Sequence, residues 1–176
     1  MKQRGFTLIE LIIVIVILGI LAVTAAPKFI DIQSDAKAAT LDGVIASMQT
    51  ANSIVYGKSL IAGNQGVAEA GTNGPTVQVN GNPVLLNFGY PSTSNVDSNA
   101  AADWGQLLNV TDFTIAVATI DDNGAVTGSA NGIVVYSGTA APTGTANRCF
   151  AFVKNNRTAS SAEGAGIIVG KVTTDC

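Results

Sequence analysis

Arg4-Gly5-Phe6-Thr7-Leu8-Ile9-Glu10 begins the stretch that decides the fold, and apolar residues continue it as far as Ala26-Pro27. From Phe6 to Ala26 the only charged residue is Glu10. At a rise of about 1.5 Å per residue, a helix of this length measures about 31 Å, close to the roughly 30 Å of a bilayer core. The sequence therefore predicts an N-terminal helix that can span a membrane.

The residues around the apolar run orient it and argue against an ordinary secretory signal. Lys2 and Arg4 precede it without any acidic residue, and positive charge beside a span keeps that end in the cytoplasm. A signal peptide has a shorter apolar core followed by a small-residue cleavage site, whereas here Gly5 stands before the run and Glu10 lies inside it. A carboxylate in apolar surroundings is costly, so Glu10 is expected to need a cation that this segment lacks.

The motif from Gly5 to Glu10, the short basic leader, Pro27 and two cysteines near the C-terminus resemble type IVa pilins. The continuation from Leu21 to Phe29 is similar in particular to the mannose-sensitive haemagglutinin pilins of marine and enteric bacteria. The resemblance implies an α+β fold, in which a long N-terminal helix carries a head with an antiparallel sheet. It also implies a chain that polymerises into a helical surface filament.

The resemblance assigns roles to residues of the N-terminal helix. A prepilin peptidase is expected to cut between Gly5 and Phe6 and to methylate the new amino group of Phe6. Glu10 would then neutralise the Phe6 amine of a neighbouring subunit, and such a buried pair fixes register because a misplaced subunit leaves both charges unpaired. Gly19 and Pro27 would mark a segment that can lose helicity in the filament. The alternative for Glu10 is an acid that reaches the membrane interface of a simple anchor.

Three parts are expected along the chain. Residues 1–5 form the leader, residues 6–57 form the long helix and residues 58–176 form the globular head. Residues 6–27 of the helix serve as the membrane span before assembly and as the filament core afterwards.

The second half of the helix has an amphipathic pattern, so that one stripe can pack on the head while the other faces outward. Either one helix continues through Pro27 or a new one begins at Ser34 or Asp35, and the resemblance favours continuity. Gly57 is the expected stop. The apolar stripe contains Leu41, Val44, Ile45, Met48, Ala51 and Val55, and the polar face contains Lys37, Asp42, Gln49 and Asn52.

The head combines turn signals with short extended runs. A hairpin is expected about Asn80-Gly81, and Asp103 to Leu108 predict a short helical turn with Trp104 as a core anchor. Alternating or apolar runs after this turn predict strands that form an antiparallel sheet on the helix. These runs are Phe113 to Ile120, Gly132 to Tyr136, Cys149 to Lys154 and Gly166 to Val172.

Cys149 and Cys176 lie in the part of the chain that would be translocated, where two cysteines are expected to form a disulfide. A zinc site is the alternative, but two cysteines without any histidine supply too few ligands. The resemblance places this pair at the border of a pilin's exposed C-terminal region.

The sequence does not favour an enzyme. It contains no histidine, no GxxxxGK[ST] loop and no CxxC pair. Asp121-Asp122-Asn123-Gly124 lacks the alternating ligands and the distant glutamate of a calcium loop, so it is interpreted as a turn. We expect no catalytic residues, no cofactor and no metal.

Charges are distributed unevenly along the head. No basic residue lies between Lys58 and Arg148, whereas several acidic ones do, and the C-terminal part is mildly basic. The favoured interpretation is two solvated faces. The alternative is that the acidic region of one subunit meets the basic C-terminal region of the next.

The predicted function is that of a major structural subunit of a type IV pilus, used for adhesion, surface attachment and biofilm formation. Expected partners are identical subunits, prepilin peptidase, the inner-membrane platform with its motor ATPase, minor pilins, and host or abiotic surfaces that include glycans. No nucleic acid is expected. The chain would lie in the inner membrane of a Gram-negative bacterium with its head in the periplasm, and then in the extracellular pilus. Alternatives are a type II secretion pseudopilin, a minor or DNA-uptake pilin, and an anchored binding domain that never polymerises.

Overall fold

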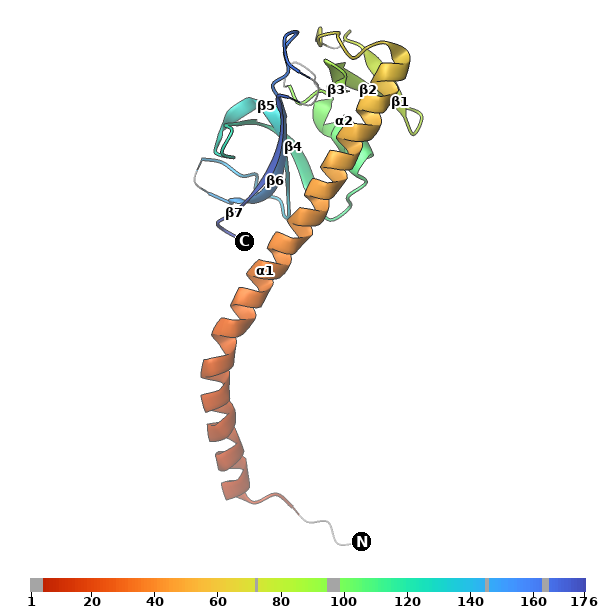
Figure 1. Ribbon diagram of the computed structural model, residues 1–176. Coiled ribbons are helices and arrows are strands. Elements are labelled where there is room, and N and C mark those ends of the chain that lie inside the picture. Colours follow the sequence, from red (N-terminus) through yellow and green to blue (C-terminus); the bar gives the residue numbers. More distant parts are fainter. Residues whose placement is uncertain (1–4, 72, 95–98, 145, 163–164) are drawn as a thin grey trace. The chain divides into compact units, whose positions relative to one another are not determined.

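The computed structural model describes residues 5–71, 73–94, 99–144, 146–162 and 165–176. The chain divides into two compact units, Met1–Lys37 and Ala38–Cys176, which are described in turn. Helix α1 (Leu8–Ala62) contributes to both units (Figure 1). Gly19 and Pro27 both lie inside this helix.

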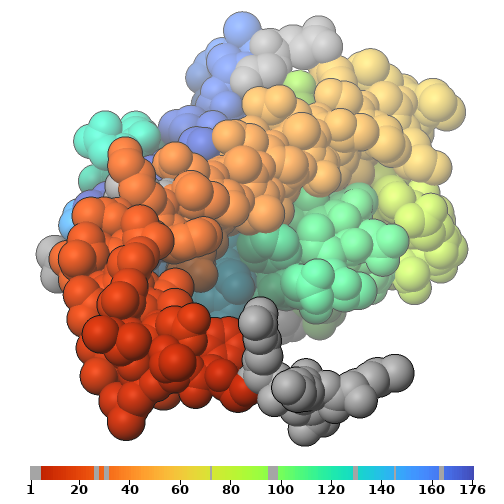
Figure 2. Space-filling model, turned by 90° about the horizontal axis from the view of Figure 1, so that it is seen from below, coloured from red at the N-terminus to blue at the C-terminus, as the bar shows by residue number. Residues whose placement is uncertain are grey.

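The first unit contains a helical segment, Leu8–Ala25, that is apolar on all sides. Leu8–Ala25 has a mean hydropathy of 3.0, is long enough to cross a membrane, and has none of its residues buried. Figure 2 shows the side chains of this segment, in red, at the surface. A helix of this kind belongs in lipid or inside an assembly, because water would contact its apolar side chains in every direction.

Helix α1 ends at Ala62 rather than at the predicted Gly57. The glycine that ends it is Gly63, whose φ of 71° is left-handed and whose N–H donates to Leu60 O at 3.2 Å. A tertiary contact explains the extra turn, because Ser59 is fully buried and its Oγ lies close to Gly89. The type of helix end was predicted correctly and its position was not.

The second unit contains two antiparallel sheets and a short helix, α2, and thus confirms the predicted α+β class (Figure 1). The order of the larger sheet is β4-β5-β6-β7, and that of the smaller is β1-β2-β3. The larger sheet consists of β4 (Thr114–Ile120), β5 (Val126–Tyr136), β6 (Cys149–Asn155) and β7 (Ile167–Thr173). The remaining elements are β1 (Thr76–Val79), β2 (Asn82–Asn87), β3 (Tyr90–Pro91) and α2 (Ala100–Leu108).

The predicted hairpin is confirmed in the smaller sheet. Val79 pairs with Asn82, and the two residues between them, Asn80 and Gly81, have φ values of 54° and 84°. Two consecutive left-handed residues are typical of a type I′ turn, whose twist matches that of the flanking strands.

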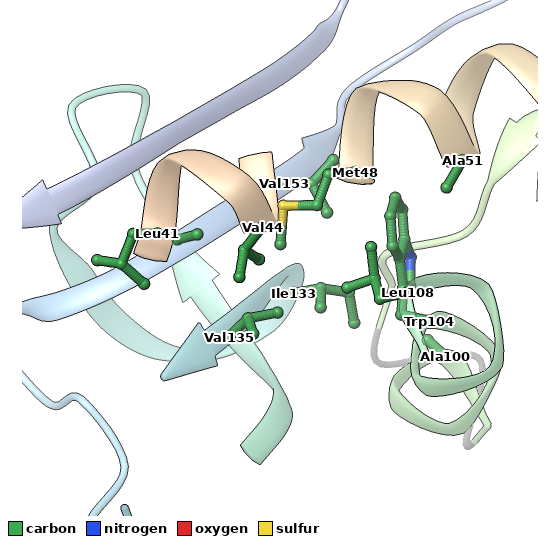
Figure 3. Packing of buried hydrophobic residues seen from close by; sticks show 11 residues of the cluster. Leu41, Val44, Met48, Ala51, Ala100, Trp104, Leu108, Ile133, Val135 and Val153 are labelled. Carbon is green, nitrogen blue, oxygen red and sulfur yellow. The ribbon is translucent and has the colours of Figure 1, made fainter. Parts of the chain in front are cut away.

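The main core lies between α1, α2 and one face of the larger sheet (Figure 3). Trp104 is fully buried at its centre, and its Nε1–H donates to the carbonyl oxygen of Ser92 at 2.9 Å. Trp104 is therefore a core anchor, as predicted. The other buried members are Leu41, Val44, Met48 and Ala51 of α1, Ala100 and Leu108 of α2, and Ile133, Val135, Ala151 and Val153 of the sheet.

Asn52 corrects the predicted polar face of α1. Lys37, Asp42 and Gln49 are exposed as expected, but only 6% of Asn52 is exposed. The head covers a wider stripe of α1 than the apolar residues mark, since Tyr56 stacks on Tyr90 with ring centroids 4.5 Å apart. The Nδ2 of Asn52 has no hydrogen-bond partner within the part of the chain that the structure describes.

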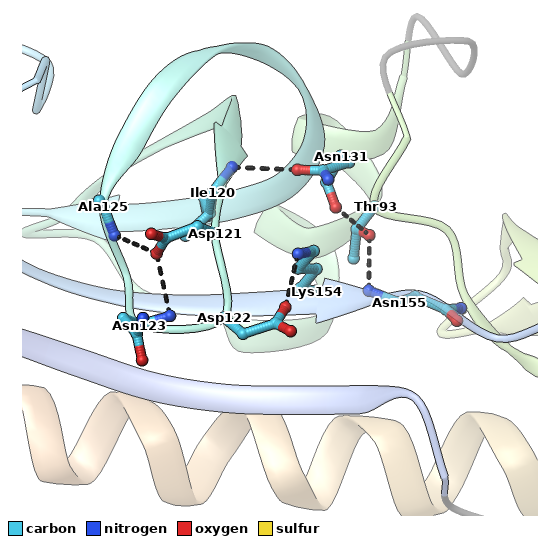
Figure 4. Close-up of polar contacts among 9 residues, drawn as sticks. All are labelled: Thr93, Ile120, Asp121, Asp122, Asn123, Ala125, Asn131, Lys154 and Asn155. Atoms are coloured by element: carbon cyan, nitrogen blue, oxygen red, sulfur yellow. Dashed lines mark hydrogen bonds and ion pairs between the residues drawn. The ribbon is translucent and has the colours of Figure 1, made fainter.

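The opposite face of the larger sheet carries a second apolar cluster, which the β4–β5 turn covers. The register of β4 against β5 shifts on both sides of Thr119, and the chain bends back over the sheet. At the tip, a Cβ added to Gly124 would lie 2.6 Å from Val172 and 2.9 Å from Phe152, so only glycine fits this close approach. Lys154 Nζ reaches Asp122 Oδ1 at 2.8 Å and holds the turn in place (Figure 4).

Candidate functional site

The N-terminus of α1 is closed by a reciprocal pair of hydrogen bonds between Thr7 and Glu10. The Thr7 N–H and hydroxyl donate to Glu10 Oε2 at 2.9 Å and 2.8 Å, and the Glu10 N–H donates to Thr7 Oγ1 at 3.4 Å. This T-x-x-E arrangement is a capping box. Glu10 therefore accepts hydrogen bonds from a residue of its own chain. The sequence analysis did not predict these bonds, although the three-residue spacing of Thr7 and Glu10 is typical of a capping box.

A carboxylate with neutral donors is still a charge in an apolar segment. Glu10 forms no ion pair with any cation among the described residues, and the leader residues Lys2 and Arg4 lie outside them. The capping box accounts for hydrogen bonding but leaves the charge uncompensated. A positively charged partner from elsewhere would therefore be strongly favoured once water is excluded.

Gly5 and Phe6 precede the helix in a non-helical segment. Phe6 is 88% exposed, and no atom lies within 4 Å of the position that a Cβ on Gly5 would occupy. An accessible, non-helical peptide bond is what a peptidase requires. The Gly5–Phe6 bond thus meets the steric requirement for cleavage next to the start of the apolar helix.

The predicted disulfide between Cys149 and Cys176 is present, with an S–S distance of 2.08 Å. Cys149 begins β6 and pairs with Thr173 of β7, so the bridge closes the β6–β7 hairpin. Next to it, Arg148 N–H donates to Asp175 Oδ2 at 2.8 Å. The bridge therefore fixes the C-terminal strand to a strand that runs through the core.

Removing this bridge is expected to destabilise the head by about 3 to 4 kcal/mol, because 27 positions separate the two cysteines and the unfolded chain gains that loop's freedom. Cys149→Ala combined with Cys176→Ala tests this by calorimetry of the detergent-solubilised chain. Ser160→Ala, an exposed change within the same hairpin, serves as the control. An unfolding temperature equal to that of the wild type would show that the strand pairing alone holds β7.

Arg157 organises the connection between β6 and β7. Its Nη1 donates to the carbonyl oxygens of Ala162 at 2.8 Å and Ala165 at 3.2 Å, and its guanidinium lies 4.9 Å from the ring centre of Tyr90. Tyr90 in turn stacks on Tyr56 of α1. Sequence analysis assigned Arg157 only to a basic region, because its partners become neighbours only after the chain folds.

The basic residues of the C-terminal part are engaged within the same chain. Lys154 pairs with Asp122, Lys171 Nζ lies 2.7 Å from Asp42 Oδ1, and Arg148 Nε lies 3.8 Å from Asp175 Oδ2. The interpretation of this region as a solvated face is wrong for Lys154, because its side chain is only 8% exposed. The alternative, in which this region binds the acidic region of another subunit, would have to break these pairs.

Asp121 is committed to the turn that it was predicted to form. Its Oδ1 accepts hydrogen bonds from the N–H groups of Asn123 at 2.9 Å and Ala125 at 2.7 Å (Figure 4). No group of three potential metal ligands occurs among the residues that the structure describes.

Residues 1–26 match the prokaryotic N-terminal methylation motif. The chain is 48% identical over 54 residues to the type IV narrow pilus major component PilA5 of Thermus thermophilus. The aligned stretch covers 31% of this chain and 47% of that protein. It is 49% identical over 49 residues to the type IV major alpha-pilin of Moraxella bovis, covering 28% of this chain and 31% of the relative.

A third relative is the type IV major pilin protein PilA of Myxococcus xanthus, 46% identical over 50 residues, which cover 28% of this chain and 23% of the relative. The chain thus spans less than half the length of each of these curated relatives. No solved structure matches the chain. The matched stretches are 49 to 54 residues long and the methylation motif covers residues 1–26, so the chemistry of the N-terminal segment is the best guide to function.

Proposed function

We propose that this chain, which carries the N-terminal methylation motif of type IV prepilins, is the major structural subunit of a type IV pilus. The motif match over residues 1–26 carries the proposal. The helix that follows supports it, because Leu8–Ala25 exposes apolar side chains on every side and contains one carboxylate. Relatives described as major pilins support the same class.

Processing and assembly follow from the chemistry of three residues. Cleavage between Gly5 and Phe6 would remove the leader and create an amino group on Phe6, which is the cation that the apolar segment lacks. In the filament, Glu10 would exchange or share its Thr7 donors with the Phe6 amine of a neighbouring subunit. A misplaced subunit would bury both charges unpaired, and this penalty would select the correct register.

The positions of the helix and the head in the filament, and the other partners of the subunit, belong to the same proposal. The apolar halves of α1 would bundle inside the filament, after leaving the inner membrane of a Gram-negative cell, and the heads would cover them. Gly19 and Pro27 would permit local loss of helix during packing. A motor ATPase and an assembly platform would supply the energy for filament assembly, and minor pilins would accompany the filament. The heads would adhere to surfaces or glycans and support biofilms. The role is structural rather than enzymatic.

Mass spectrometry of fibres sheared from cells that make this chain tests the proposal. The expected species begins at a methylated Phe6 and contains the intact disulfide. Gly5→Ser is expected to remove that species, because the residue before the cut is changed. A chain that keeps residues 1–5 and stays in the membrane fraction of wild-type cells would identify an anchored domain instead.

A further inference from the structure

Nearly every charged side chain described in the unit Ala38–Cys176 has a partner within the chain. Three ion pairs, several hydrogen bonds accepted by carboxylates and others donated by the guanidinium group of Arg157 account for them. The side chains of two residues, Lys58 and Asp112, are exceptions, because neither makes an ion pair or a hydrogen bond within the part of the chain that the structure describes. They are exposed and opposite in charge.

Lys58 stands at a largely apolar groove of about 450 Å³ beside α1. Figure 2 shows the second half of α1, in light orange to yellow, on the surface alongside α2 in green. Ile54, which is 50% exposed, lines the groove one turn before Lys58. The groove is also lined by Ser47 and Thr50 of α1, Val79 of β1 and Leu107 of α2.

The hydroxyl groups that line this groove already donate hydrogen bonds within helix α1, so a partner need not accept hydrogen bonds from them. Ser47 Oγ donates to the carbonyl oxygen of Gly43 at 2.9 Å, and Thr50 Oγ1 donates to that of Ala46 at 2.8 Å. The donor of each hydroxyl is thus satisfied by the helix backbone. A partner can cover them without leaving a buried donor unpaired, and Lys58 is the one charge that it must match.

Asp112 lies in the short connection between α2 and β4, which is anchored on both sides. Asn109 closes α2 in a left-handed conformation, with its N–H donating to Gly105 O at 3.1 Å. Val110 and Phe113 pack against the main core, whereas Asp112 between them is exposed. This connection is held at both ends, so presenting the carboxylate of Asp112 to a partner costs little ordering entropy.

We propose that the groove beside α1 receives the α2–β4 connection of a second copy of this chain, with Asp112 of that copy paired to Lys58. The assignment deepens the proposed pilus function and rests on it. In the proposed filament this contact is heterologous, because Lys58 of one copy meets Asp112 of the next and the contact repeats from copy to copy into an open helical assembly. Complementary charge then fixes the register of one head on the next.

Paired cysteines in two separately tagged copies test this contact. Cells co-express the full chain with Lys58→Cys under one tag and with Asp112→Cys under another, and sheared filaments are run on non-reducing gels. A disulfide-linked species that contains both tags is expected, and it can arise only between copies. Thr139→Cys, at an exposed position of the β5–β6 connection, replaces Asp112→Cys as the matched control and should give no such species.

Charge exchange gives an independent readout. Lys58→Asp and Asp112→Lys are each expected to lower the yield of sheared filaments roughly tenfold, and the double exchange should recover most of it. Both positions are exposed, so equal amounts of disulfide-bonded chain in the membrane fraction should verify folding. Normal filaments that lack the mixed cross-link and do not respond to charge exchange would overturn the contact and leave the pilus proposal standing. Absence of filaments from wild-type cells would overturn both.

Discussion

Glu10→Gln is expected to leave the chain cleaved and inserted in the membrane but absent from sheared filaments. Glutamine at this position still completes the capping box with Thr7, because its side-chain oxygen accepts the same hydrogen bonds as Glu10 Oε2. It carries no charge, however, so the amine of Phe6 on the neighbouring subunit would be buried alone. Breaking a buried pair in this way costs about 3 to 5 kcal/mol per contact, and every subunit of a filament would bear that cost.

Thr7→Val is the matched control for this result. It removes the hydroxyl that caps α1 but keeps the carboxylate, and loss of a capping residue costs about 0.5 to 2 kcal/mol. Filaments should therefore persist at reduced yield. Mass spectrometry and immunoblotting of sheared and membrane fractions separate the two variants. Normal assembly of Glu10→Gln, with poor assembly of Thr7→Val, would show that Glu10 acts as a helix cap and would remove the charge-pairing argument.

Trp104→Ala is expected to destabilise the head by about 3 to 5 kcal/mol, which is typical for truncating a fully buried aromatic residue. Trp104 joins α1, α2 and the larger sheet, so the cavity would open where three elements meet (Figure 3). The carbonyl of Ser92 would also lose its donor. Calorimetry of the full chain in detergent should show an unfolding temperature lower by on the order of 10 to 20 °C.

Trp104→Phe separates the two contributions of this side chain. Phenylalanine keeps most of the apolar contact but removes Nε1 together with part of the indole ring, so a loss of about 1 to 2 kcal/mol is expected. Equal losses for alanine and phenylalanine would mean that the hydrogen bond to Ser92, and not the packing, anchors α2. An unfolding temperature unchanged in Trp104→Ala would contradict the assignment of Trp104 as the core anchor.

Some features depend on local chemistry, and the sequence alone determined them. The apolar run before Pro27 can only be a helix in an apolar environment, because unsatisfied backbone groups are too costly there. Asn80-Gly81 predicts its turn because few other residues accept two left-handed conformations in succession. The disulfide between Cys149 and Cys176 followed from translocation and from the presence of two cysteines in the chain.

Other features were decided by tertiary structure, because they depend on partners far away in the sequence. Helix α1 passes Gly57 since Ser59 is buried beside Gly89, and that contact outweighs the roughly 1 kcal/mol preference against glycine within a helix. Asn52 looks polar and exposed in the helical pattern, yet the packed head covers it.

For the charged residues too, the sequence determined one part and the tertiary structure decided another. Composition revealed an acidic middle and a basic end but no pairing, since an ion pair such as Lys171–Asp42 joins residues that only the fold brings within 2.7 Å. Sequence therefore determined the elements whose cause lies within a few neighbouring residues. The tertiary structure decided which of the described charges are paired within the chain and which, like Lys58 and Asp112, are not, because burial and pairing energies arise only between packed surfaces.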